Sequence, residues 1–176
     1  GCAERVDGLR VEVSVRNTQP VALTTATIAI EEVQLQPCAQ RAAWWSPLST
    51  AHAHGLEVHS EPRLVHAAML VDLTSTDVQP LATWKPPPGA ICHVRVAFRP
   101  STGESASSGT TVFLEGEVAG ARFRQLVTTQ REVVLPIDPT EPNFALQLEA
   151  TPPPAGTDAA TTLEQFATTL TAKVVP

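Results

Sequence analysis

Histidines are concentrated in one part of this 176-residue sequence. The chain has five of them, four within fifteen residues of one another and one further on: His52, His54, His59, His66 and His93. A single residue separates His52 from His54, so in an extended backbone both imidazoles project to the same side. Two imidazoles at that spacing can bind one metal ion, and imidazole suits copper, zinc and nickel. The pair therefore predicts part of a metal site.

Two histidines do not complete such a site. The candidates for further ligands are His59, His66, Met69, Asp72 and His93. The thioether of Met69 would favour Cu(I), although Met69 could equally belong to the core. His66 alternates with Leu64 and Ala68, which favours a satisfied core histidine or one on the face of a strand over a ligand. We expect His93 to face solvent. The alternative for the whole cluster is a solvated loop without a ligand.

Two tryptophans, Trp44 and Trp45, precede the histidine pair. Adjacent large rings in a loop most often cover the edge of a core, since Trp combines a large apolar surface with one polar atom. Their closeness to His52 and His54 allows a second interpretation, in which one of them lines a metal site. The sequence leaves both open.

The cysteines divide into one terminal residue, Cys2, and two internal ones, Cys38 and Cys92. In an oxidising compartment the internal two are expected to form a disulfide, which would close a loop of more than fifty residues around the histidine cluster. Such a bridge stabilises by about 4 kcal/mol in the chain-entropy model. The alternative is a pair of unbridged core cysteines.

The start of the sequence, Gly1 followed by Cys2, resembles the end of a bacterial lipoprotein signal, in which the cysteine becomes lipidated. On that interpretation residues 1–7 form a tether, residues 8–176 form one domain, and the protein is exported to the periplasm or anchored to the outer membrane. The alternative is that the two residues carry no signal.

Charge and hydropathy exclude several classes of protein. The net charge is −6, which disfavours nucleic acid and anionic membrane surfaces as partners because both require a basic face. No apolar run approaches the roughly 20 residues that cross a bilayer. No Gly-x-Ser-x-Gly motif, glycine-rich phosphate loop or cofactor fingerprint occurs, so we do not expect an enzyme.

Most of the remaining sequence has the alternation typical of strands. Residues 8–16 alternate cleanly, residues 21–38 change phase near Glu31 and Glu32, and that change predicts a β-bulge. Seven or eight short strands separated by turn signals predict an all-β fold, an antiparallel β-sandwich of the Ig-like or Greek-key type with long loops. Within residues 151–170, Leu163, Phe166 and Leu170 recur at helical spacing, which predicts a short C-terminal helix after a proline-rich link.

Four other segments carry more specific expectations. Residues 63–73 are nearly continuously apolar, which indicates a central strand or a short buried helix. Residues 80–89 contain several prolines, so we expect them to interrupt regular structure. Residues 101–109 predict a hairpin loop, and residues 110–129 predict a hairpin that turns over residues 119–121. Residues 39–62 carry no strand pattern and are too long for a bare connector.

Three stretches of the sequence resemble the MbnP-like proteins. They are "ATIAIEEVQLQPC", then "AHAHG" in a loop, then "PPPGAICHVRVAF", and the resemblance covers roughly residues 8–148. Proteins of this family are exported by bacteria, many as lipoproteins, and are associated with copper handling. By this resemblance the metal is copper ahead of zinc, His52 and His54 are the leading ligands, and Trp44 or Trp45 is the place for an aromatic partner, which in some members is an oxidised tryptophan, kynurenine.

Two functions remain from this reasoning. The first is an envelope protein that binds copper through the His-X-His loop for storage, scavenging or delivery. The second is an envelope module without metal that recognises a protein or a glycan through its loops, as many β-sandwiches do.

Overall fold

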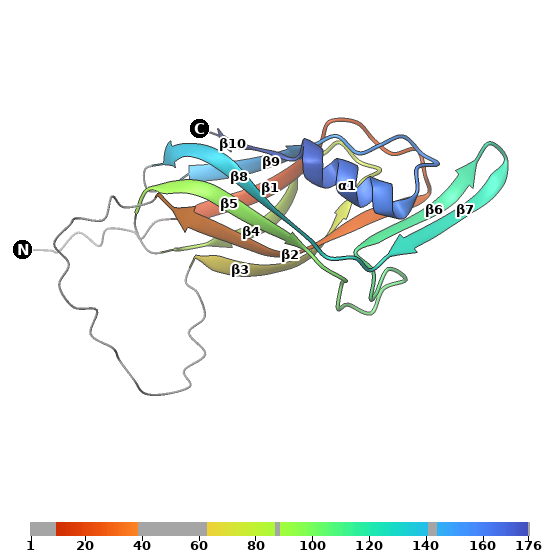
Figure 1. Cartoon of the computed structure of the whole chain (residues 1–176), viewed down its shortest axis with the longest axis horizontal. Helices are drawn as coiled ribbons and strands as arrows, with labels where there is room; N and C mark the ends of the chain where they lie inside the picture. Colours follow the sequence, from red (N-terminus) through yellow and green to blue (C-terminus); the bar gives the residue numbers. More distant parts are fainter. Residues whose placement is uncertain (1–9, 39–62, 87–88, 141–143, 176) are drawn as a thin grey trace, which may run out of the picture.

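The computed structural model describes residues 10–38, 63–86, 89–140 and 144–175, which form two stacked β-sheets and one helix (Figure 1). The four-stranded sheet has the order β10 (Thr171–Val175), β9 (Phe144–Ala150), β1 (Val11–Asn17), β4 (Gln79–Trp84). The six-stranded sheet has the order β7 (Ala121–Val127), β6 (Val112–Val118), β2 (Thr25–Pro37), β5 (Ile91–Phe98), β8 (Arg131–Thr140), with β3 (Leu64–Asp72) also paired to β2. The prediction of an all-β sandwich is confirmed.

The sheets are not purely antiparallel. β1 runs parallel to β9, from the pair Val11 and Phe144 to the pair Asn17 and Ala150, and every other strand pair is antiparallel within the residues that the structure describes. Sequence alternation cannot distinguish the two directions, because it reports only which face of a strand is buried.

The six-stranded sheet is built around the long strand β2. Its second half pairs with β5, as far as Ile30 and Phe98, and its first half pairs on the same side with β6, beginning at Ile28 and Val112. β5 and β6 therefore follow one another along a single edge of β2. The prediction that residues 101–109 form a hairpin loop was wrong, because β5 and β6 do not pair with each other. Residues 99–111 instead leave the line of these two strands after β5 and return to it before β6. The hairpin of β6 and β7 is confirmed, and it projects beyond the rest of the molecule (Figure 1).

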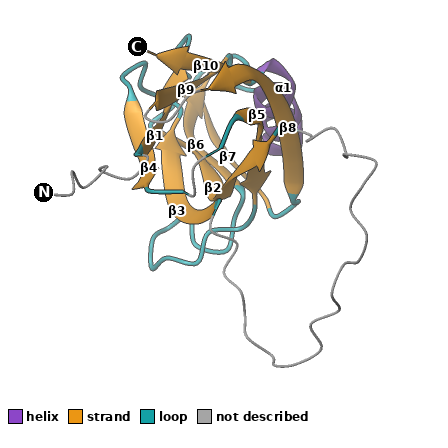
Figure 2. Ribbon diagram, turned by 90° about the vertical axis from the view of Figure 1, so that its left-hand side faces the viewer, coloured by secondary structure: helices purple, strands orange, loops and turns teal. Residues whose placement is uncertain are grey.

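Alternation fixes which side chains fill the space between the sheets. Val11, Val13 and Val15 of β1 are fully buried while the residues between them are not. The helix α1 (Ala159–Thr169) closes the side of the sandwich next to β8 (Figure 2), and its Phe166 ring meets the Phe98 ring edge to face at 5.9 Å between centroids. Burial of rings in such a contact stabilises beyond the area that they bury. The C-terminal helix is thus confirmed.

The helix begins at an N-cap. The carboxylate of Asp158 accepts hydrogen bonds from the hydroxyl and the backbone amide of Thr161, at 2.6 and 2.9 Å. Those two bonds, the hydroxyl first, hold the pKa of Asp158 below its ordinary value. The cap satisfies an amide that the first turn would otherwise leave without a partner.

Two expectations about single strands were wrong in detail. Residues 63–73 contain β3, which is neither a helix nor a central strand, because it pairs with β2 alone. The proline-containing stretch after Val78 begins with β4, which runs through Pro80 to Trp84 and whose only neighbour is β1. An edge strand tolerates proline because the amide that is missing would point away from the sheet.

The predicted bulge near Glu31 and Glu32 is confirmed. The register between β2 and β3 shifts between Ile30 and Glu32, and on the β3 side the chain passes through Ala68 with a φ of 42°. A residue with a Cβ atom rarely adopts this left-handed conformation, so the bulge holds Ala68 under strain.

Within the described residues, no helix has the length and apolarity needed to cross a membrane.

Candidate functional site

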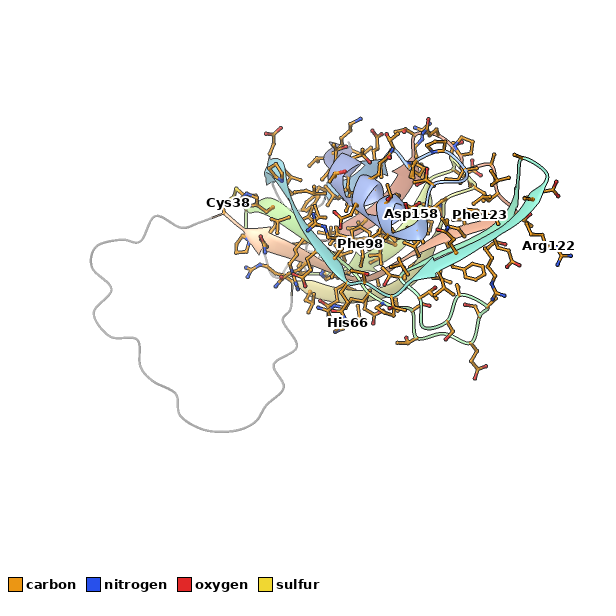
Figure 3. The ribbon with its side chains drawn as sticks, turned by 45° about the vertical axis from the view of Figure 1, so that its right-hand side comes forward. Cys38, His66, Phe98, Arg122, Phe123 and Asp158 are labelled. Atoms are coloured by element: carbon orange, nitrogen blue, oxygen red, sulfur yellow. A yellow bond between two sulfur atoms is a disulfide. The ribbon has the colours of Figure 1, made fainter. Side chains whose placement is uncertain are left out.

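The histidine-rich segment 39–62 is joined to one end of the six-stranded sheet. Cys38 and Cys92 form a disulfide, with 4.8 Å between their Cα atoms, and the amide of Cys38 donates to the Ala90 carbonyl at 3.0 Å. On the other side of β2, the Leu35 amide donates to the Arg63 carbonyl at 2.9 Å, just before β3 begins. The predicted disulfide is confirmed, and both ends of the segment are fixed at the same end of β2, where Figure 3 labels Cys38.

Several predicted site residues lie outside the described residues. They are Cys2, Trp44, Trp45, His52, His54 and His59. The lipidation of the first, the aromatic role of the next two and the metal ligation of the three histidines therefore stay predictions.

His66 and His93 are both on the face of the six-stranded sheet that points away from the core. His66 is on β3 opposite Glu32, and its side chain is 68% exposed, while His93 is on β5 opposite Gln36 and is exposed. The outward orientation of His93 was expected, whereas for His66 the sequence had left a core position open beside one on a strand face. The two histidines are four residues apart along the strand direction, which is about 13 Å, and two strands apart across the sheet, which is about 10 Å. Two imidazoles so far apart cannot reach one ion at about 2 Å from each.

Met69 and Asp72 do not join either histidine. Met69 is partly buried on β3 opposite Ile30 and packs against the core, which agrees with the second of its two interpretations. The Asp72 carboxylate accepts from the amide and the hydroxyl of Thr74, at 2.8 and 2.7 Å, and so stabilises the turn after β3. Within the described residues, no group of three or more His, Cys, Asp or Glu side chains is placed to hold a metal ion.

The outward face of the six-stranded sheet carries a group of linked polar side chains that the sequence did not reveal. We call it the Arg95 cluster, and it consists of Glu32, Gln34, Arg95, Arg99 and Glu132. Arg95 donates to Gln34 Oε1 at 2.9 Å and to Glu132 Oε1 at 2.8 Å. Arg99 donates to Glu32 Oε1 at 2.9 Å. The cluster thus links side chains of β2, β5 and β8. β3 joins it through His66, whose Nδ1 lies 3.8 Å from Oε1 of Glu32.

Burial makes these contacts stronger than ordinary surface ion pairs. The Glu32 side chain is only 10% exposed, so its charge requires partners, and it has two guanidinium groups within 3.3 Å. Glu132 is more exposed, and its hydrogen bond and charge interaction with Arg95, followed by those with Arg99, hold the pKa of Glu132 below its ordinary value of 4.5. Two positive and two negative charges balance, so the Arg95 cluster is locally neutral.

The cluster was missed because it depends on register. Alternation along residues 91–99 is enough to place Arg95 and Arg99 on the outward face. Their acidic partners belong to β2 and β8, and the sequence does not state which residues of those strands lie opposite. A useful signal was present in the position of Glu32 directly after the bulge, where an acidic residue interrupts an apolar strand.

Comparison with known proteins gave no match. No family model matches the chain, and neither a curated protein nor a solved structure matches it.

Proposed function

We propose that this protein is an exported envelope protein that binds copper through the segment 39–62, with His52 and His54 as its first ligands. It would store, scavenge or deliver the ion rather than turn over a substrate. The observation that carries the proposal is the frame around the segment. The disulfide at Cys38 and the hydrogen bond at Arg63 hold its two ends at one end of a rigid sheet.

That frame favours binding because it lowers the entropy that ligands lose when they gather around an ion. Fixing both ends of a segment restricts the conformations of the free protein, which is the general basis of preorganisation. His59 is the nearest further ligand in the sequence.

Export is supported by the same disulfide. Bridges of this kind persist in oxidising compartments such as the bacterial periplasm and are rare in the cytosol. Lipidation at Cys2 would add a membrane anchor, and it forms part of the proposal only through the sequence pattern at Gly1 and Cys2.

The test is a titration of natively purified protein with Cu(I) and with Cu(II). We expect the His52→Ala, His54→Ala double variant to bind copper more weakly than the wild type by more than about a hundredfold, because it loses ligands directly. The matched control is the His66→Ala, His93→Ala double variant, which removes the same number of imidazoles from residues that cannot converge. It should retain an affinity within about tenfold of the wild type.

Equal copper affinities in the wild type and the His52→Ala, His54→Ala variant would refute the proposal. The alternative, an envelope module without metal that binds a protein or a glycan, would then take its place. Mass spectrometry of the intact protein tests the aromatic partner separately, because conversion of Trp44 or Trp45 to kynurenine changes the mass of a single peptide.

A further inference from the structure

A cavity of about 270 Å³ lies beside the β-bulge, between β2, β3 and the loop that contains Ser101 and Ser105. Residues of β2 and β3, among them Ala29, Ala68 and Met69, form the side that we call its floor, and Glu31 of β2 also lines it. The volume is slightly below the range of about 300–1,000 Å³ for small-molecule sites. The loop that forms its other wall is seen below the sheet in Figure 1.

The bulge explains why this space is open. In a regular sheet, outward side chains from neighbouring strands stand next to one another and fill the surface between them. Here the register of β2 and β3 shifts between Ile30 and Glu32, and two of the lining residues near the shift, Ala29 and Ala68, carry the small side chain of alanine. Ala68 is also held at a φ of 42°, and backbone strain of this kind is concentrated at functional positions.

The wall opposite the floor is held by its own hydrogen bonds. The Ser101 amide donates to the Thr110 carbonyl at 3.0 Å, and the Gly109 amide donates to the Ser101 carbonyl at 2.8 Å. The Ser101 hydroxyl donates to the carbonyl of Ser107, a residue that is itself buried. The loop is therefore built as a fixed wall, and the cavity exists before any ligand arrives.

Glu31 brings a negative charge to the lining of the cavity. It has no ion pair or side-chain hydrogen bond with any other described residue. The guanidinium groups of Arg95 and Arg99 are paired with Glu132 and Glu32. A cation that enters the cavity would accordingly meet a carboxylate that has no charged partner in the described part of the chain, together with hydroxyl oxygens that can accept hydrogen bonds.

From these observations we infer that the cavity is a binding site for a small organic ammonium ligand with an apolar body. The alkyl part contacts Ala29, Ala68 and Met69, and the unbranched thioether of Met69 adapts its shape to that part. The ammonium group donates to the Glu31 carboxylate. Ligand binding in this cavity does not depend on copper binding.

Met69 provides a direct reporter, because it is the single methionine of the chain. Protein labelled with ¹³C at the methionine methyl group gives one methyl resonance, and that methyl belongs to a residue that lines the cavity. We expect n-butylammonium to shift this resonance saturably at pH 7. We expect n-butanol, which has the same body without the charge, to bind at least about tenfold more weakly, as does butyrate.

Two variants test the roles of the residues. Glu31→Gln keeps the size of the side chain and should weaken n-butylammonium binding about tenfold, while Glu117→Gln, an exposed glutamate on β6 away from the cavity, should leave it unchanged. Ala29→Leu should fill the floor and abolish binding, and if that variant does not fold, the Glu31 comparison decides. A resonance that does not shift, equal affinity for butylammonium and butanol, or equal effects of the two glutamate variants would overturn the inference.

Discussion

The guanidinium of Arg95 donates from Nη1 to Oε1 of Glu132 over 2.8 Å and so joins the edge strand β8 to β5 on the outward face of the six-stranded sheet. This contact is the main reason why the pKa of Glu132 is lowered. A carboxyl group whose pKa is lower in the folded state stabilises the fold above its unfolded pKa and loses that contribution as the pH falls through its folded pKa.

The first prediction therefore concerns pH. Glu132→Gln should lower the melting temperature by about 1–3 °C at pH 7, because exposed pairs contribute little. The difference between wild type and variant should shrink as the pH falls below the ordinary value of 4.5, where the wild-type carboxylate also becomes protonated. Thermal unfolding of both proteins from pH 7 to pH 2.5 measures it. A difference that stays constant over this range would contradict the assignment.

Gly116 of β6 gives a prediction about close packing. A Cβ atom built on Gly116 would lie 2.8 Å from the backbone amide nitrogen of Thr24 and 3.1 Å from Cδ2 of Leu23, and a backbone atom cannot move aside cheaply. Gly116→Ala should lower the free energy of unfolding by about 1–3 kcal/mol. Gly103→Ala is the control, since no atom lies within 4 Å of its Cβ position. Equal denaturation midpoints for the two variants would show that the chain at Thr24 does not approach β6 this closely.

The rings of Phe98 and Phe166 give a prediction about the packing of the helix on the sheet. A double-mutant cycle with Phe98→Leu and Phe166→Leu should yield a coupling energy of about 0.5–1.5 kcal/mol, as expected for edge-to-face rings. Urea denaturation of the four proteins provides the values. As a control, the cycle should be repeated with Thr168→Ala on the exposed side of α1 in place of the Phe166 change, and its coupling with Phe98→Leu should be near zero. Similar coupling in both cycles would mean that the rings do not interact specifically.

Most of the fold that could be predicted from the sequence was predicted from the alternation of apolar and polar residues. It identifies the buried face of each strand, so the inward valines of β1, the outward His93, and the bulge near Glu31 and Glu32 could be predicted. It contains no information on strand order, which is why the parallel pairing of β1 with β9 and the in-line arrangement of β5 and β6 were not. β4 was missed because the rule that proline breaks strands applies to sheet interiors, and Pro80 lies on an edge.

The candidate sites, too, could be predicted only where a local pattern in the sequence indicates them. The disulfide could be predicted because two cysteines leave a single pairing once Cys2 is set aside. The Arg95 cluster and the cavity could not, because each combines residues from strands or loops that are far apart in sequence. Glu31 and Ser101 approach only because residues 99–111 return over the bulge, and no local pattern encodes that path.

The last prediction concerns the disulfide, whose two cysteines are 54 residues apart. Replacing both, as Cys38→Ser and Cys92→Ser, should lower the free energy of unfolding by about 4 kcal/mol, because the unfolded chain regains the entropy of a loop of that length. Denaturation in guanidinium chloride measures the change, and reduced wild-type protein should match the double variant. A loss below about 1 kcal/mol would contradict the entropic account. If the frame also organises segment 39–62, the double variant should bind copper more weakly than the wild type at a temperature where both remain folded, because its ligands must then gather from a less restricted segment.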